Sequence, residues 1–274
     1  MDIKTVITDL DGTLLLPDGT VGDYSRGVFK RLREKNIDIH IATGRPLSGA
    51  LISTRGLELA PEMAVFNGTQ LYHRHSEELF QNKTLPQNVV EHAIKRLEEE
   101  DMDYFIYHEE VRYRREGRHY KISKNLDQFF HGVQLVKDPD SIPKERCPRV
   151  AFWGLEHELI ELTHEFRELP DIYVESFPFS AIETFPDEDL YFVEIHFFCE
   201  GKVELLRWLE KERGITPEQV MAFGDQNNDI SLLKAAGYGF AVANAFKPCL
   251  EAADEIIESN AQEAVAKKLE ELFL

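Results

Sequence analysis

Short apolar runs alternate with helix-like stretches at both ends of the 274-residue chain. Near the N-terminus, the β-branched run at 4–10 is followed by helical periodicity at 24–35 and by an alternating run at 37–42. The same alternation returns from residue 202 onward. Strands that alternate with helices predict right-handed βαβ units and a parallel sheet. The other elements expected in these regions are helices at 46–56, 202–213, 229–236 and 261–272 and strands at 63–66, 220–224 and 239–242.

The middle of the chain has a different pattern. A helix predicted at 86–100 is followed by two aromatic-rich strands, at 104–107 and 111–114, with no helix between them. Strands in direct succession favour antiparallel pairing. We therefore predict a parallel-sheet core, residues 1–81 and 199–274, interrupted by an inserted α+β domain at 82–198. The further elements expected in the insertion are a helix at 156–168 and strands at 149–153, 173–177, 181–185 and 191–198.

The composition is that of a globular protein with a strong excess of acid. Hydrophobic residues make up 43% of the chain, and 31 Lys+Arg stand against 50 Asp+Glu, so 31 − 50 gives a net charge of −19. This charge argues against binding to nucleic acid or to an anionic membrane, since both would repel the chain. A phosphate site on such a chain must recruit a cation or gather basic groups. The acidic surface is consistent with a monomer or a small homo-oligomer.

The cysteines and the N-terminus indicate a cytoplasmic protein. Cys147, Cys199 and Cys249 are far apart and have no CxxC spacing, so we expect reduced thiols. The chain enters a strand pattern at once, which leaves no room for a signal peptide. It also has no run of eighteen or more apolar residues that would predict a membrane span.

The first candidate chemistry is Asp9-Leu10-Asp11-Gly12-Thr13, directly after the first predicted strand. In an open parallel sheet, ligands bind beyond the carboxyl ends of the strands. Asp9 and Asp11 are close enough to reach one site, and two such carboxylates repel each other unless a cation lies between them. Their hard oxygen ligands suit Mg²⁺. Gly12 lets the backbone turn and present N–H groups to an anion. The alternative is an ordinary strand-to-turn ending.

A second acidic cluster follows another short strand, in Gly224-Asp225-Gln226-Asn227-Asn228-Asp229. Asp225 and Asp229 are placed to complete a metal site that the first motif begins. The alternative is an Asx turn in which Asn228 or Asp229 caps the next helix. Both interpretations can hold together, because a capping carboxylate and a ligand can occupy neighbouring positions.

Two shorter motifs point to an anion. Thr43-Gly44-Arg45 ends one predicted strand and precedes a helix, where a hydroxyl and free amides make an anion site, although a simple helix cap is the favoured alternative. Lys202 heads another predicted helix, and the macrodipole disfavours a cation there unless an anion is near. Most such lysines are merely solvated.

Together and in this order, the four motifs resemble the haloacid dehalogenase (HAD) superfamily. The resemblance is to its Cof-type phosphatases, which carry an α+β cap of type IIB. It also covers Asn67-Gly68, the cap-sized insertion and the stretch around Ser259-Asn260. It implies an α/β fold in which a HAD-like Rossmannoid parallel-sheet core carries an inserted type IIB cap.

The resemblance implies a role for each motif. Asp9 would be the nucleophile that forms an aspartyl-phosphate, and Asp11 the general acid and base. Mg²⁺ would be held by Asp9, the Asp11 carbonyl and Asp225, with Asp229 supporting it or ligating through water. The residues that would hold the phosphoryl oxygens are Leu10 and Gly44 through their amides, together with Thr43, Lys202 and Asn228, while Arg45 and Asn67 would support the site from behind or from the substrate side.

Three segments depart from the pattern of the Cof-type branch. The sequence Val-Ala-Asn-Ala at 242–245 replaces the more familiar Met-Gly-Asn-Ala, and the stretch that begins at Asn260 lacks the usual Asp and Gly. The approach to the lysine, at 199–202, lacks the usual Pro or Ser. None of these changes removes a catalytic group, but they alter the rim of the site and with it any inference about substrate identity.

A basic cluster stands out in the insertion of this acidic chain: Arg112, Arg114, Arg115, Arg118 and Lys121. One hypothesis is that these side chains contact a second anionic group of the substrate. Strand alternation puts Arg112 and Arg114 on one face, so a solvated face is the favoured interpretation.

The expected function is a Mg²⁺-dependent phosphatase that acts on a small phosphorylated metabolite. Sugar phosphates are the best-supported substrate class, and a cap over the site makes large substrates such as phosphoproteins unsuitable. One alternative is a phosphomutase on the same scaffold, which returns the phosphoryl group to the substrate. The other is a catalytically silent ligand-binding or regulatory protein, because a fold alone does not prove activity.

Overall fold

The computed structural model describes residues 2–116, 133–178 and 190–274, which form two compact units. The core unit is Met1–Asn82 with Cys199–Leu274, and the inserted unit is Lys83–Phe198. The predicted strand at 181–185 and the basic residues Arg118 and Lys121 lie outside the described residues. Within the described ranges, no helix is long and apolar enough to cross a membrane.

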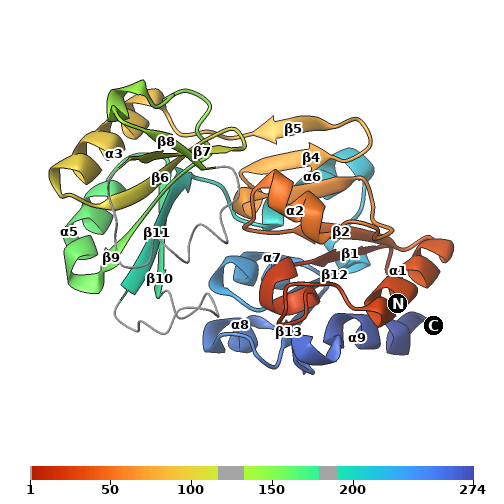
Figure 1. The fold of residues 1–274 in the computed structure, drawn as a ribbon. Helices are drawn as coiled ribbons and strands as arrows, with labels where there is room; N and C mark the ends of the chain where they lie inside the picture. Colours follow the sequence, from red (N-terminus) through yellow and green to blue (C-terminus); the bar gives the residue numbers. More distant parts are fainter. Residues whose placement is uncertain (1, 117–132, 179–189) are drawn as a thin grey trace. The chain divides into compact units, whose positions relative to one another are not determined.

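The core unit is built on an eight-stranded sheet in the order β14-β13-β12-β1-β2-β3-β4-β5 (Figure 1). The strands from β14 to β3 are parallel, as the βαβ pattern predicts, and β3, β4 and β5 pair antiparallel. The predicted α/β fold class is therefore confirmed. The strands are β1 (Thr5–Thr8), β2 (Asp38–Ala42), β3 (Glu62–Val65), β4 (Gln70–His73), β5 (Glu78–Asn82), β12 (Val220–Gly224), β13 (Tyr238–Val242) and β14 (Glu255–Ile257).

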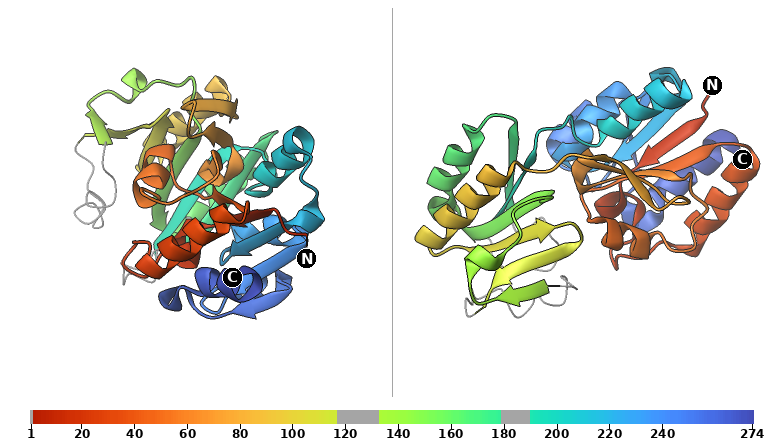
Figure 2. Two further views of the ribbon diagram at one scale, coloured as in Figure 1. Left: turned by 90° about the vertical axis from the view of Figure 1, so that its right-hand side faces the viewer. Right: turned by 90° about the horizontal axis from the view of Figure 1, so that it is seen from above.

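The order in which the chain adds strands to this sheet reverses at the neighbouring parallel strands β1 and β12. From β1 the chain proceeds to β2 and β3, and from β12 it proceeds the other way to β13 and β14. In open α/β sheets, ligands bind beyond the carboxyl ends of the strands at such a reversal. Figure 2 shows α1 and α6 on opposite sides of the sheet. The helices are α1 (Asp23–Glu34), α2 (Leu47–Ser53), α6 (Val203–Arg213), α7 (Ile230–Ala235), α8 (Lys247–Ala252) and α9 (Ala264–Phe273).

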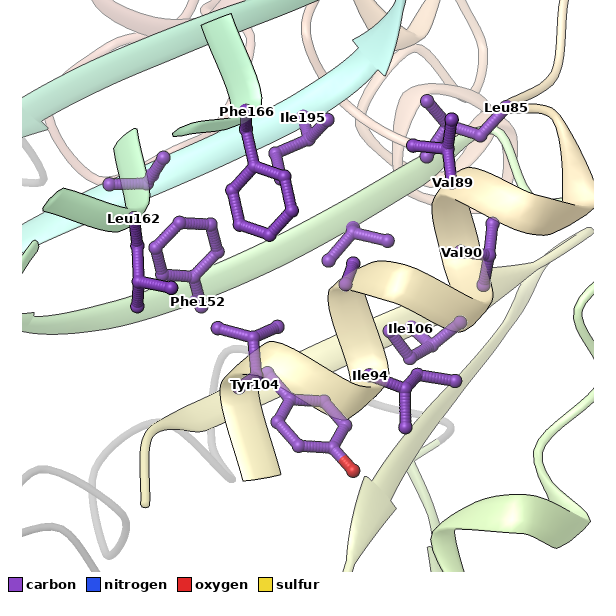
Figure 3. Close-up of a cluster of buried hydrophobic side chains, with 14 of the residues drawn as sticks. Leu85, Val89, Val90, Ile94, Tyr104, Ile106, Phe152, Leu162, Phe166 and Ile195 are labelled. Carbon is purple, nitrogen blue, oxygen red and sulfur yellow. The ribbon is translucent and has the colours of Figure 1, made fainter. Parts of the chain in front are cut away.

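The inserted unit has a six-stranded sheet in the order β10-β11-β9-β6-β7-β8, with α3 and α5 on one face (Figure 1). Its neighbours pair antiparallel except β7 and β8, which are parallel. Figure 3 shows Tyr104, Phe152 and Phe166 in the apolar layer between the helices and the sheet. The elements are α3 (Gln87–Glu99), β6 (Asp103–His108), β7 (Val111–Arg115), β8 (Val133–Val136), β9 (Arg149–Leu155), α5 (Glu156–Arg167), β10 (Ile172–Pro178) and β11 (Leu190–Phe197).

Several boundaries differ from the prediction for local reasons. The β4–β5 hairpin was not predicted, because most side chains of β5 are exposed and it lacks an apolar run. The closing helix begins at Ala264 rather than 261, since Asn260–Gln262 form a tight turn and Glu263 has a φ of 55°. Such a positive φ interrupts a right-handed helix.

Candidate active site

The two predicted acidic motifs meet where β1 and β12 end. The parallel register pairs Thr8 with Phe223, and the Asp9 amide donates to the Phe223 carbonyl at 3.1 Å. One carboxylate oxygen from each of Asp9, Asp225 and Asp229 lies within 4.8 Å of the others, and all three residues are buried. We call these three residues the carboxylate cluster. It lies at the switch point of the sheet, where ligands bind in open α/β folds.

Lys202 lies inside this cluster. Its Nζ is 2.8 Å from Asp9 Oδ1 and 2.7 Å from Asp229 Oδ1, and the residue is only 1% exposed. Burial alone would lower the pKa of Lys202, but the charges of Asp229 and Asp9 outweigh it and raise this pKa above its ordinary value. The interpretation of Lys202 as a solvated lysine is therefore wrong. The lysine is a fixed positive charge between two carboxylates.

Asp229 organises the loop that precedes it. Its Oδ2 accepts hydrogen bonds from the amides of Asp225 and Gln226, both at 3.0 Å, while its Oδ1 accepts from Lys202. Its side chain makes no capping bond to α7 itself. Its bond from the Gln226 amide instead belongs to a capping box of the short turn Asn227–Asp229 that leads into α7, so the predicted capping role holds only for this turn. Gly224 is required here, because a Cβ at that position would lie 2.4 Å from the Cβ of Asp229.

The carboxylate cluster holds more negative charge than Lys202 can balance. Burial raises the pKa of Asp9 well above its usual value; Lys202 opposes this rise, while Asp229 and Asp225 add to it. Burial, followed by repulsion from Asp229, raises the pKa of Asp225 to about 6. Three ionised carboxylates with one ammonium leave an excess of two negative charges. A divalent cation with oxygen ligands fits this donor set.

Gly12 and Thr13 bring the first motif against the second. Gly12 has a φ of 71°, and a Cβ on it would lie 2.4 Å from Asp225 Oδ2. The Thr13 hydroxyl donates to Asp225 Oδ1 at 2.6 Å. Thr13 was not among the predicted site residues, although it is the last residue of the first motif, two positions after Asp11. Its contact fixes the orientation of the Asp225 carboxylate.

The Asp11 side chain is separate from the carboxylate cluster. Arg45 donates two parallel hydrogen bonds to the Asp11 carboxylate, from Nε to Oδ2 at 2.7 Å and from Nη2 to Oδ1 at 2.5 Å. Such forked pairs are among the stronger charged hydrogen bonds. The Asp11 side chain is 56% exposed, so its carboxylate remains accessible from solvent. Arg45 also donates to the Ser53 hydroxyl of α2.

The predicted phosphate-binding residues lie around the same strand ends. Thr43 is buried, and its hydroxyl accepts a hydrogen bond from the Arg45 amide at 3.2 Å. The N-cap residue of α2 is Pro46, so Thr43 does not cap that helix. A Cβ at Gly44 would lie 2.8 Å from Asn67 Oδ1. Leu10 is buried and begins the turn after β1.

Asn67 and Asn228 are joined by their side chains. Asn228 Nδ2 donates to Asn67 Oδ1 at 3.0 Å. Among the described residues, the buried Asn228 Oδ1 has no hydrogen-bond partner. Asn67 thus orients Asn228, which agrees with a supporting position for Asn67. The orphaned oxygen marks a place where a polar ligand atom would be accommodated.

Arg112 and Arg114 belong to the inserted unit and are not members of the carboxylate cluster. Arg114 is 5% exposed and lies 3.8 Å from Asp103, so the predicted solvated face is wrong for this residue. Arg112 lies over the ring of Tyr107, and the distance from the Arg112 Cζ to the ring centroid is 5.6 Å. Both arginines are on the sheet face opposite to the apolar layer of α3 and α5.

Comparisons with known proteins agree with this geometry. The sequence profile described as haloacid dehalogenase-like hydrolase matches residues 6–269. The chain is 28% identical over 243 residues to the HMP-PP phosphatase of Klebsiella pneumoniae, and the aligned region covers 88% of this chain and 85% of the relative. It is 24% identical over 271 residues to the 5-amino-6-(5-phospho-D-ribitylamino)uracil phosphatase YcsE of Bacillus subtilis, covering 98% and 95%.

A solved structure shows the same fold along the whole chain. The haloacid dehalogenase-like hydrolase from Bacteroides thetaiotaomicron superposes with a TM-score of 0.83 at 25% identity, covering 99% of this chain and 100% of that one. Because the family profile spans nearly the entire sequence, the chain is an enzyme that belongs to the haloacid dehalogenase-like hydrolases.

Proposed function

We propose that this protein is a Mg²⁺-dependent phosphatase that hydrolyses a small phosphorylated metabolite through an aspartyl-phosphate on Asp9. The observation that carries the proposal is the buried carboxylate cluster with Lys202 at the switch point of a parallel sheet. The names of the two curated relatives, both phosphatases, support the same reaction class.

The reaction proceeds in two displacements at phosphorus. A carboxylate oxygen of Asp9 forms a bond to phosphorus while the bond to the leaving oxygen breaks, and Asp11 donates a proton to that oxygen. Asp11 then takes a proton from water, which attacks the aspartyl-phosphate and releases inorganic phosphate. Lys202 holds Asp9 Oδ1 at 2.8 Å, which fixes the orientation of the carboxylate.

Asp9, the Asp11 carbonyl and Asp225 would hold Mg²⁺, with Asp229 supporting them. When bound, the metal would neutralise charge on the carboxylate and phosphoryl oxygens. Both oxygens of Asp229 already accept protein hydrogen bonds, so its main contribution is to hold Lys202 and the loop. Thr43, Lys202, Asn228 and the amides of Leu10 and Gly44 would bind the phosphoryl oxygens.

Arg45 would keep Asp11 oriented until substrate arrives. The forked pair engages both carboxylate oxygens of Asp11. An Arg45→Lys variant keeps the charge but loses the fork, which makes it the natural comparison for this role.

For the substrate we propose a phosphorylated sugar or polyol. The Bacillus relative is named for a substrate with a phospho-D-ribityl chain, which belongs to this chemical class. We further propose that the inserted unit is the cap and that Arg112 or Arg114 contacts a second anionic group of the substrate. Unchanged kinetics of an Arg112→Ala/Arg114→Ala variant on the best substrate would refute the contact with a second anionic group. We also predict from the sequence that the protein is cytoplasmic and that it is a monomer or a small homo-oligomer.

The test is a phosphate-release screen over phosphorylated sugars, polyols, nucleotides and pyridoxal phosphate. We expect release with Mg²⁺, none with EDTA, and a loss of at least ~10³-fold in Asp9→Asn, because the nucleophile is gone. Release that survives Asp9→Asn would refute the mechanism.

The same screen separates the alternatives. Release of inorganic phosphate without added sugar bisphosphate would exclude the phosphomutase. Silence of the folded, Mg²⁺-loaded protein across the whole panel would favour the phosphomutase or a ligand-binding protein.

A further inference from the structure

The turn that carries Asp9 and Asp11 is held from outside by two asparagine side chains. Asn244, which follows β13, donates from Nδ2 to the Gly12 carbonyl at 2.8 Å. Asn260, which follows β14, donates from Nδ2 to the Leu15 carbonyl at 2.8 Å. The first contact joins residues that are 232 positions apart in the chain, and the second joins residues that are 245 positions apart.

The two asparagines are also bonded to each other. The Asn260 amide donates to Asn244 Oδ1 at 3.0 Å. Because the Asn244 side chain accepts at Oδ1 and donates at Nδ2, only one orientation of its carboxamide satisfies both partners. We call Asn244 and Asn260 the asparagine brace.

Within the turn, one backbone hydrogen bond closes the segment and two carbonyl groups accept from outside it. Its closing bond runs from the Leu15 amide to the Leu10 carbonyl at 2.9 Å, which leaves the Gly12 and Leu15 carbonyls for other donors. Gly12 has a φ of 71° and has no side chain to restrict it. A movement of Gly12 would carry Asp11 and Thr13 with it, and Thr13 orients Asp225.

We propose that Asn244 and Asn260 are positioning residues that keep the aspartate-bearing turn in its reactive shape. The proposal rests on the proposed function, since the reaction is what the positioning serves. Asn244 is exposed, so its bond to Gly12 contributes little to the stability of the fold. Its value lies in geometry, because small displacements of reacting groups lower rates steeply.

The kinetic test compares Asn244→Ala with Gln262→Ala, an exposed side chain near Asn260 in the same region. For Asn244→Ala we expect kcat to fall about 10- to 100-fold, while the KM changes by less than about threefold. Gln262→Ala should match the wild type. Asn244→Asp keeps an acceptor for the Asn260 amide but turns an oxygen toward the Gly12 carbonyl, so its kcat should fall at least as far.

A second measurement does not depend on activity. Hydrogen exchange of peptides that cover residues 9–16, in the substrate-free protein, should become faster in Asn244→Ala and stay unchanged in Gln262→Ala. Asn260→Ala should show the same faster exchange together with a lower Tm, because Asn260 is buried.

The outcomes separate the brace from the reaction. Wild-type kcat and wild-type exchange in Asn244→Ala would overturn the brace, while loss of activity in Asp9→Asn would keep the proposed function intact. Conversely, faster exchange in Asn244→Ala, in a protein whose wild type releases no phosphate from any panel member, would support the brace and refute the phosphatase.

Discussion

Two buried groups of charges, one in each unit, differ in their balance. In the core unit, Asp9, Asp225 and Asp229 share Lys202 as their cation among the described residues. In the inserted unit, Arg149 Nη1 donates to Glu194 Oε1 at 2.6 Å. Among the described residues, the first group gathers three carboxylates around one lysine, whereas the second is built on an arginine–glutamate ion pair.

The position of each group in its sheet accounts for this difference. Arg149 and Glu194 lie within the neighbouring strands β9 and β11, where the register places Arg149 opposite His196 and Glu194 opposite Ala151, so the ion pair is a diagonal contact between the two strands. The carboxylate cluster lies on loops beyond the strand ends, where backbone amides hold Asp229. Clusters of buried titratable groups beyond strand ends are common at functional sites.

The largest expected effect is the loss of folding stability when the cation of each group is replaced by an apolar side chain. Lys202→Met should cost about 3–5 kcal/mol of stability, because it leaves buried carboxylates without their counter-charge. Arg149→Met should cost less, about 2 kcal/mol, since the neighbouring Glu194 has a pKa already raised to about 7 and takes up a proton readily. Urea unfolding at pH 7.5 measures both. An equal cost for the two variants would erase the distinction.

A smaller effect should come from Mg²⁺. At about 100 times its dissociation constant the ion should stabilise the protein by about 2.7 kcal/mol. Hydrogen exchange should slow in peptides from β12 and the loop after it, and stay unchanged in peptides from β9. Asp225→Asn should abolish the effect. Equal protection of both units, or protection that survives Asp225→Asn, would contradict a metal site at the carboxylate cluster.

The smallest effect concerns pH in the inserted unit. Burial, opposed by Arg149, raises the pKa of Glu194 from 4.5 to about 7. Its stabilising contribution is therefore fully present below pH 4.5 and is lost as the pH rises through 7. Burial and the charge of Arg149 lower the pKa of His196 from 6.5 to about 4, so its contribution is present above pH 6.5 and is lost as the pH falls through 4.

These two contributions oppose each other between pH 4.5 and 6.5. Glu194→Gln removes the first and leaves the second, so the variant should gain stability relative to the wild type as the pH rises from 5 to 6.5. Groups elsewhere, such as Asp225 with its pKa raised to about 6, titrate in both proteins and cancel in this comparison. Thermal unfolding at pH 5, 5.75 and 6.5 measures this slope, and parallel curves for the two proteins would show that Glu194 does not titrate as described.

The acidic motifs were predictable because they are local. Asp9 and Asp11, like Asp225 and Asp229, stand beside short apolar strands, and a parallel sheet brings strand ends to one edge. The β4–β5 hairpin was missed since β5 is largely exposed and has no apolar run. Arg114 was assigned to a solvated face because strand alternation shows which residues share a face, but not which face is buried.

The sequence by itself determined the α/β class, the order of the motifs and the residue types that meet at the strand ends, since periodicity and short spacing are local properties of a chain. Only the tertiary structure decided the bonds between distant segments: the Arg45 fork on Asp11, the Thr13 bond to Asp225 and the Asn244 bond to Gly12. The last two join residues more than 200 positions apart. Such contacts depend on how loops from different strands converge, and no local pattern encodes that convergence.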